Sequence, residues 1–299
     1  MTASERGILL LCCPMGDPEA RPLTLAQFRE LSKRASAIGI GTGDPLADIR
    51  PKDLGRLGYS QREAEHIVGL LSREARLEQY LARGRAYGFK PVTRLSDGYP
   101  TRLAVQRGMS CPPLFFFAGN LSLFQRPCVS VVGSRRLREA GERFARRAGI
   151  LAAKEGFTLV TGGAAGADQT AQTACLEAGG SVIAFLPDNL RHHATMAGER
   201  CLICSEGGYD LPFSSARALT RNTYIHMLGE KTLVAQTDYG TGGTWSGAME
   251  NLKHGWSPLF VLADGSQGAS ALAERGAVPI HSLESLRTLA DPQECIFSE

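Results

Sequence analysis

The sequence lacks an apolar run long enough to cross a membrane. Its most hydrophobic N-terminal stretch, GILLLCC at residues 7–13, is far shorter than the roughly 20 residues that a spanning helix needs, and no small-residue cleavage site follows it. The eight cysteines have no secretory context, so we expect reduced thiols rather than a disulfide framework. We therefore expect a cytoplasmic protein without a membrane partner.

A strong metal-binding pattern and a strong overall charge are also missing. Cys201 and Cys204 form a single C-x-x-C, whereas a zinc site of this type needs a second pair of ligands, so we expect a buried strand and no metal. The formal charge is only +3, which makes no case for nucleic acid by itself, because any anion must then be recognised by a local patch. Residues 126–147 contain such a cluster, with seven arginines and two glutamates.

Two nucleotide-binding fingerprints are absent. The dinucleotide pattern needs G-x-G-x-x-G after a strand and an acidic residue about 20 positions later, but the next predicted strand ends in Thr161 and glycines. No G-x-x-x-x-G-K-[ST] loop is present either. Binding of NAD and hydrolysis at a P-loop lose support, and we expect no cofactor.

The pattern of apolar residues changes near Pro127. Residues 24–86 show helical spacing, with a capping box at Ser60 and Glu63. Beyond Pro127, continuous apolar runs alternate with helical stretches: CVSVVG, FTLVTGG, SVIAFLP, CLICSE, TLVAQTD and SPLFVLAD. This alternation predicts an α/β fold, a Rossmann-like, doubly wound and mostly parallel sheet covered on both faces, preceded by a small helical domain. We place the helical domain and its connector at residues 1–118 and the α/β domain at residues 119–299.

Three of the predicted strands end in glycine-rich turns. Doubly wound sheets bind ligands beyond the carboxyl ends of their strands, and helix-start amides beside a hydroxyl and a guanidinium form an anion site. Each glycine alone could serve a tight turn, and Asp168 alone could be a helix cap, but successive glycine-rich strand ends favour a phosphate cradle. Its candidate residues are Gly133, Ser134, Arg135, Arg136, Gly162, Gly163, Gly166, Asp168, Gly242, Gly243 and Thr244.

The same strand ends contain no convincing catalytic pair. Asp168 falls in a helix first turn, which favours its charged form, and Glu250 lies a turn and a half into another helix. Acid–base or nucleophilic catalysis needs a titratable group or an activated nucleophile aimed at a reacting atom. We therefore expect a binding protein with no catalytic residues.

From Val92 onward the chain resembles the DNA-processing protein A family, also called DprA or Smf. The resemblance covers roughly residues 20–280 and rests on motifs in the family's order: YPTRL, PPLFFFAGN, VVGSR, VTGGAAGAD, CSE, RN at Arg221 and GTGGTWSGA. It implies a SAM-like helical domain, an extended Rossmann domain, sequence-independent binding of single-stranded DNA, a homodimer, and loading of a RecA-type recombinase during natural transformation. It also adds Ser205, Glu206, Arg221 and Asn222 to the DNA-binding residues.

The chain departs from the family pattern at several positions. Ala165 stands where the family usually has arginine, Gln172 stands where it has histidine, and PDNLRHH at residues 187–193 replaces a G-x-G-x-D turn. Arg136, Arg191 or the two histidines could compensate for the missing arginine. We also expect no C-terminal winged helix, since little sequence follows SLESLRTLADPQE at residues 282–294.

Two other functions stay open from the sequence. GTGGTWSGAME resembles the P-G-G-x-G-T-x-x-E loop of nucleoside-monophosphate phosphoribohydrolases, although the leading proline is missing and Glu250 lies six residues after Thr244 rather than three. A sensor of a small nucleotide on the same sheet would use the same pockets. The cellular role, whether transformation, repair or phage defence, is open as well.

Overall fold

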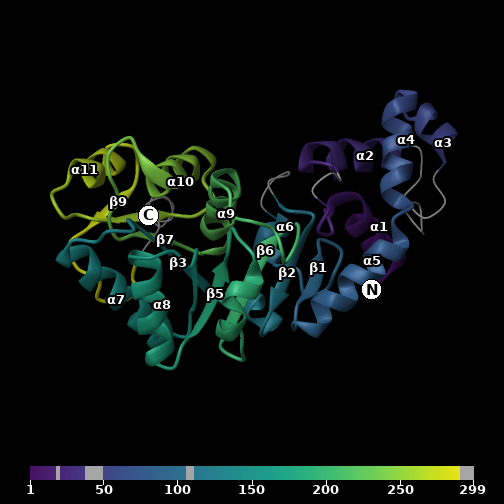
Figure 1. Cartoon of the computed structure of the whole chain (residues 1–299). Helices are drawn as coiled ribbons and strands as arrows, with labels where there is room; N and C mark the ends of the chain where they lie inside the picture. Colours follow the sequence, from purple (N-terminus) through teal and green to yellow (C-terminus); the bar gives the residue numbers. More distant parts are fainter. Residues whose placement is uncertain (18–20, 38–49, 106–110, 290–299) are drawn as a thin grey trace.

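A computed structural model describes residues 1–17, 21–37, 50–105 and 111–289, and this part of the chain is organised around one nine-stranded sheet (Figure 1). The strand order is β1-β2-β6-β5-β4-β3-β7-β8-β9. The β1–β2 and β2–β6 pairs are antiparallel, and all other pairs are parallel. The strands are β1 Lys90–Thr93, β2 Leu114–Ala118, β3 Cys128–Val132, β4 Thr158–Thr161, β5 Ser181–Phe185, β6 Cys201–Glu206, β7 Thr232–Val234, β8 Leu259–Leu262 and β9 Val278–Ile280. The predicted α/β class and mostly parallel sheet are confirmed.

Helices cover both faces of this sheet, as expected for strands that are apolar along their whole length. Helices α7 and α8 pack on one face, and α9, α10 and α11 pack on the other (Figure 1). The helices of the α/β part are α6 Thr101–Val105, η1 Leu121–Gln125, α7 Glu139–Glu155, α8 Ala167–Glu177, η2 Leu190–Met196, α9 Ser215–Leu228, α10 Gly242–His254 and α11 Gln267–Ala273. The chain places β4, β5 and β6 in succession on one side of β3, and then returns to place β7, β8 and β9 on the other side. The order of the strands therefore reverses between β3 and β7.

The N-terminal helices stand beside the β1 end of the sheet (Figure 1). They are α1 Ala3–Cys12, α2 Leu25–Ala37, α3 Pro51–Arg56, α4 Gln61–Leu71 and α5 Glu74–Ala86. Ser60 and Glu63 form the predicted capping box. The apolar stretch of residues 7–13 belongs to α1, which the sequence pattern did not predict, and it is buried in the core against α4 and α5. Within the described residues, no helix is long and apolar enough to cross a membrane.

The two halves of the chain share a sheet and a core. Strand β2 lies between β1 and β6, with Phe115 paired to Glu206. One hydrophobic cluster continues from α1 and α4 through Phe116 of β2 to Phe144 of α7. A domain boundary after Ala118 would therefore separate β2 from β6, and the division into residues 1–118 and 119–299 stays a prediction.

Candidate functional site

A cavity of about 530 Å³ opens at the carboxyl ends of β4, β3 and β7, which are neighbours in the sheet. This is the edge at which open α/β sheets bind ligands, next to the position where the direction of growth reverses. The structure brings together here many of the residues predicted from the sequence: Gly133, Ser134, Arg135, Asp168, Arg221, Asn222, Gly242, Gly243 and Thr244. We call this cavity the strand-end pocket.

The turns after β3 and β4 interlock at one side of the pocket. The amide of Ala167 donates to the carbonyl of Ser134 over 3.2 Å. Gly166 has a φ of +79°, and a side chain there would collide with the carbonyl of Ser134, so this position requires glycine. The tight contact fixes Arg135 at the pocket mouth, where its side chain is exposed.

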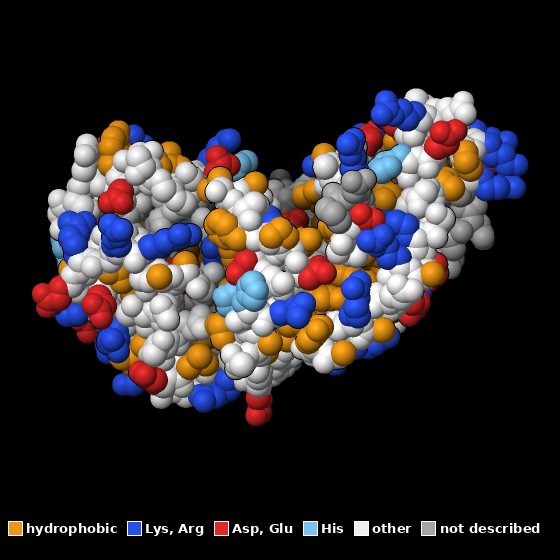
Figure 2. All heavy atoms as spheres, viewed as in Figure 1, with side chains coloured by type: hydrophobic (Ala, Val, Ile, Leu, Met, Phe, Trp, Pro, Cys, Tyr) orange, Lys and Arg blue, Asp and Glu red, His pale blue; other side chains and the backbone are white. Residues whose placement is uncertain are grey.

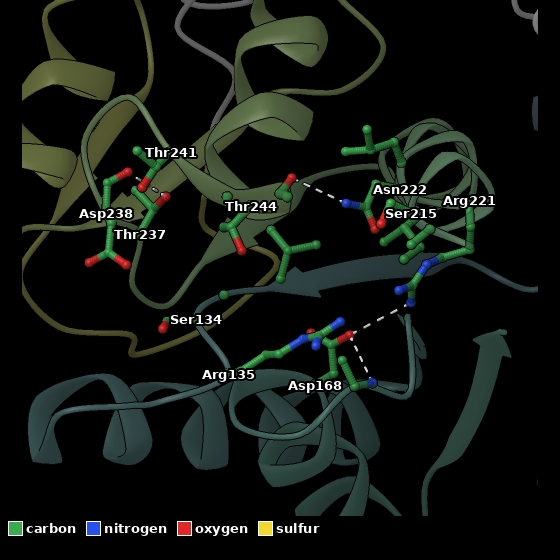
Figure 3. A pocket seen from close by; sticks show the side chains of 18 of the residues that line it. Ser134, Arg135, Asp168, Ser215, Arg221, Asn222, Thr237, Asp238, Thr241 and Thr244 are labelled. Atoms are coloured by element: carbon green, nitrogen blue, oxygen red, sulfur yellow. Dashed lines mark hydrogen bonds and ion pairs between the residues drawn. The ribbon is translucent and has the colours of Figure 1, made fainter. Parts of the chain in front are cut away.

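Asp168 and Arg221 are buried together beneath this turn. The Asp168 carboxylate accepts from the amides of Gly162 (2.9 Å) and Ala164 (3.4 Å), and its Oδ2 lies 4.0 Å from Nη1 of Arg221. That same Nη1 donates to the carbonyl of Phe185 over 3.2 Å. In Figure 3, Arg135 and Arg221 extend toward Asp168 from opposite sides. The pair thus fixes the β4 turn and leaves Nε of Arg221 without a hydrogen-bond partner among the described residues.

Burial shifts the pKa of both members of this pair. The side chains of Asp168 and Arg221 are each only 9% exposed. Burial raises the pKa of Asp168 and lowers the pKa of Arg221, and each charge opposes the shift of its partner. Desolvation therefore outweighs their mutual attraction, so the pair is held by the fold around it rather than being a source of net stability.

Helices α9 and α10 form the other wall of the pocket. The side-chain amide of Asn222 donates to the carbonyl of Gly243 over 3.1 Å and joins the two helices. Below it, His226 lines the pocket but is only 1% exposed. Burial lowers the pKa of His226 to about 4, so the ring is neutral at physiological pH. Its Nδ1 has no hydrogen-bond partner in the described part of the chain.

Several lining residues were missed in the sequence. Phe213 and Leu219 are large apolar side chains that are exposed at the pocket, and residue type alone did not distinguish them from core residues. The others are Val132, Ala164, Ser215, Ala218, Ile225, His226, Thr237, Asp238 and Thr241. Thr237, Asp238 and Thr241 come from the loop after β7 and face Ser134 across the pocket (Figure 3).

Other predicted residues lie outside the pocket lining. Ser205 accepts from Nη2 of Arg217 over 2.7 Å, and the carbonyl of Glu206 accepts from Nη1 of the same guanidinium over 3.1 Å. Burial raises the pKa of Glu206, while a hydrogen bond from Tyr224 opposes that shift. Arg136 is exposed nearby but does not line the cavity. The DNA-binding role of these residues stays a prediction.

The predicted C-x-x-C lies within a buried strand. Cys201 and Cys204 are both in β6 and both buried, which confirms the strand interpretation of that motif. In the described ranges, no group of three or more His, Cys, Asp or Glu side chains is arranged to hold a metal ion.

Comparison with known proteins identifies the family. The model of the family described as DNA recombination-mediator protein A matches residues 90–290. The chain belongs to this family. It is 30% identical over 200 residues to the DNA processing protein DprA of Streptococcus pneumoniae, covering 63% of this chain and 70% of that protein. It is 32% identical over 146 residues to the protein Smf of Synechocystis, covering 47% of this chain and 36% of that protein.

Solved structures of family members share the fold. The crystal structure of Streptococcus pneumoniae DprA superposes with a TM-score of 0.74 at 23% identity, covering 94% of this chain and 95% of that one. Helicobacter pylori DNA processing protein A, whose structure concerns its mode of binding single-stranded DNA, gives a TM-score of 0.55 at 25% identity over 65% of this chain and 91% of that one. The family resemblance seen in the sequence is confirmed by the family model and by the Streptococcus pneumoniae relative.

Proposed function

We propose that this chain binds single-stranded DNA in the strand-end pocket by contacting phosphates, without reading the bases. Its membership in the recombination-mediator family and the single-stranded DNA named for the Helicobacter pylori relative support this ligand. The observation that carries the proposal is Arg135, an exposed guanidinium at the mouth of the pocket that makes no ion pair within the described residues. A free guanidinium recognises phosphate oxygens in a charge-assisted, often bidentate manner.

The start of α10 supplies further donors. Thr241 before α10 occupies an N-cap position without a side-chain cap hydrogen bond, and Gly242, Gly243 and Thr244 from its first turn line the pocket. The first amides of a helix lack intrahelical partners and carry partial positive charge. A helix start at the cavity, across from the exposed guanidinium of Arg135, suits a strand of phosphates.

Recombination supplies the biological setting of the proposal. We infer from family membership that the bound strand is passed to a RecA-type recombinase, and that a cytoplasmic homodimer performs this task. We also infer that the chain catalyses nothing. Asp168 is held by two backbone amides and Arg221, and Glu250 on α10 is engaged by Lys253 and His254 on its own helix.

A titration with labelled oligothymidine at two salt concentrations tests this function. Phosphate contacts predict tight binding whose affinity falls steeply with salt, and an oligonucleotide of mixed sequence should bind about as well. Tight binding of nucleoside monophosphates without binding of oligothymidine would instead indicate the nucleotide sensor. Release of free base from monophosphates, abolished by Glu250→Gln, would indicate the phosphoribohydrolase.

A further inference from the structure

A second cavity, of about 400 Å³, lies between the C-terminal end of α5 and the short helix η2. It is lined by Tyr87, Phe89, Asn189, Arg191, His192 and Ala194, and it shares no lining residue with the strand-end pocket. Figure 2 shows histidine, basic and hydrophobic side chains gathered on the surface over η2 and beside it. We call this cavity the Tyr87–Arg191 pocket.

Its chemistry is that of a stacking site. The Tyr87 side chain is 51% exposed, and the guanidinium carbon of Arg191 lies 4.5 Å from the centre of its ring. Phe89 lies behind Tyr87 at 6.5 Å between ring centres. Arg191 makes no ion pair with any described residue, so its charge is not neutralised by the protein. Aromatic rings and free guanidinium planes together form the platforms on which proteins stack bases of single strands.

The charges around this pocket favour an anionic polymer. Arg83 and Arg85 occupy the last turn of α5, and Lys90 follows at the start of β1; all three are exposed. The two carboxylates of the neighbouring segments are already engaged: Asp188 with His193 at 3.0 Å, and Asp210 with the hydroxyl of Tyr80 at 2.6 Å. The surroundings therefore present positive charge that can attract phosphates.

The segment that lines the second cavity begins beside residues that neighbour the lining of the strand-end pocket in the chain. The carbonyl of Pro187 accepts from Nε of Arg217 over 2.9 Å, and the side chain of Leu186 closes on Gly163 in the turn after β4. A few residues later the same segment, PDNLRHH, places Asn189, Arg191 and His192 in the second cavity. The resemblance to the family implies a G-x-G-x-D turn in the place of this segment. Single-stranded DNA that leaves the strand-end pocket along this segment would run toward the Tyr87–Arg191 pocket.

We propose that the Tyr87–Arg191 pocket is a second contact for the same single strand, in which the Arg191 guanidinium moves from the Tyr87 ring to a phosphate and the adjoining base takes its place on the ring. The inference rests on the proposed function, since it assumes that a single strand occupies the strand-end pocket. It assigns to the divergent segment the task of extending the binding surface, and to Tyr87 a role in affinity for long strands.

Binding of a short and a long oligothymidine separates the two pockets. An oligothymidine of about 4 nucleotides, the low end of known site sizes, occupies one pocket only, whereas a long one reaches both. Tyr87→Ala should weaken binding of the long strand about fivefold or more, because one stacked base is lost, and should leave the short one unchanged. Tyr87→Phe keeps the ring and should bind like the wild type. Arg191→Ala should also weaken binding of the long strand. Arg62→Ala, which removes an exposed arginine of α4 that lines neither pocket, is its matched control.

Each outcome decides the proposal. A long oligothymidine carrying a photoreactive 5-iodouracil should crosslink to the peptide that contains Tyr87. If Tyr87→Ala binds the long strand as the wild type does, or if Arg62→Ala weakens binding as much as Arg191→Ala, the second contact is wrong while the strand-end pocket stands. Unchanged DNA binding with weakened binding of an acidic peptide would overturn it in favour of a protein partner. If the wild type binds no oligothymidine at all, the proposed function itself fails.

Discussion

At two places along the carboxyl edge of the sheet an arginine lies beside polar residues. The two arginines differ in whether their guanidinium groups are hydrogen-bonded to the protein. At the ends of β4, β3 and β7, Arg135 is exposed at a cavity and makes no ion pair in the described part of the chain. At the end of β6, Arg217 donates to Ser205, to the carbonyl of Glu206 and to the carbonyl of Pro187. A guanidinium whose donors are taken by the protein stabilises the fold, and one whose donors are free can bind a ligand.

The largest loss of folding free energy is expected at Gly162, in the turn after β4, where the packing leaves no room for a side chain. A side chain at position 162 would overlap Nη1 of Arg221 and approach Oδ2 of Asp168 to 2.8 Å. Gly162→Ala should therefore separate the buried pair and lower the free energy of unfolding by about 3–5 kcal/mol, as measured by denaturant titration. Gly198→Ala is the matched control, because a side chain there would meet no atom within 4 Å. Equal stability of the two variants would show that the β4 turn is not fixed by this pair.

The buried His226 of the strand-end pocket should make the stability of the fold sensitive to acid. Burial lowers the pKa of His226 from 6.5 to about 4, so between these values the unfolded chain binds a proton that the folded one does not. Stability due to this residue is present above pH 6.5 and is lost as the pH falls toward 4, by about 3 kcal/mol at 1.36 kcal/mol per unit. His226→Gln should lose less stability over this range than the wild type, whereas His281→Gln, at an exposed site, should follow the wild type. Parallel pH profiles for all three proteins would contradict a buried neutral imidazole.

The smallest loss of folding free energy is expected at the end of β6, where a substitution tests whether Arg217 differs from Arg135 in DNA binding. Ser205→Ala removes the acceptor of Nη2 of Arg217 and should cost about 1 kcal/mol of folding free energy, the usual net value of one hydrogen bond. Because the Arg217 guanidinium is committed to protein acceptors, affinity for oligothymidine should stay unchanged. A clear loss of affinity would instead place Ser205 in the DNA site, as the family motif implies.

Much of the fold could be predicted from local patterns. The six apolar runs from CVSVVG to SPLFVLAD became β3 to β8, because strands buried on both faces must be apolar throughout. The glycines at 133, 166 and 242 marked the strand ends that meet, because parallel neighbours end at the same edge. What failed was the edge of the sheet. The sequence analysis predicts no strand at Lys90–Thr93, since four residues carry little periodicity.

The partner that each arginine contacts could not be predicted from the sequence. Arg217 and Arg221 lie one helical turn apart on α9 with similar neighbours in sequence. Only the packing of α9 across the sheet decides that Arg217 reaches Ser205 while Arg221 reaches Asp168. The same holds for His226, whose burial depends on α10 packing over it: a side chain at Gly247 would lie 2.9 Å from its Nε2. Such contacts join residues far apart in the chain and leave no local pattern.

The salt dependence of DNA binding by Arg135→Ala tests the central claim most directly. The variant removes an exposed side chain that makes no ion pair with the described residues, so its fold should be unchanged, and Arg143→Ala on the outer face of α7 removes an equal charge away from the pocket. If Arg135 contacts a phosphate, Arg135→Ala should weaken every oligonucleotide about tenfold and lower the slope of log affinity against log salt by about one unit, while Arg143→Ala keeps the wild-type slope. An unchanged slope for Arg135→Ala would contradict phosphate binding at the strand-end pocket.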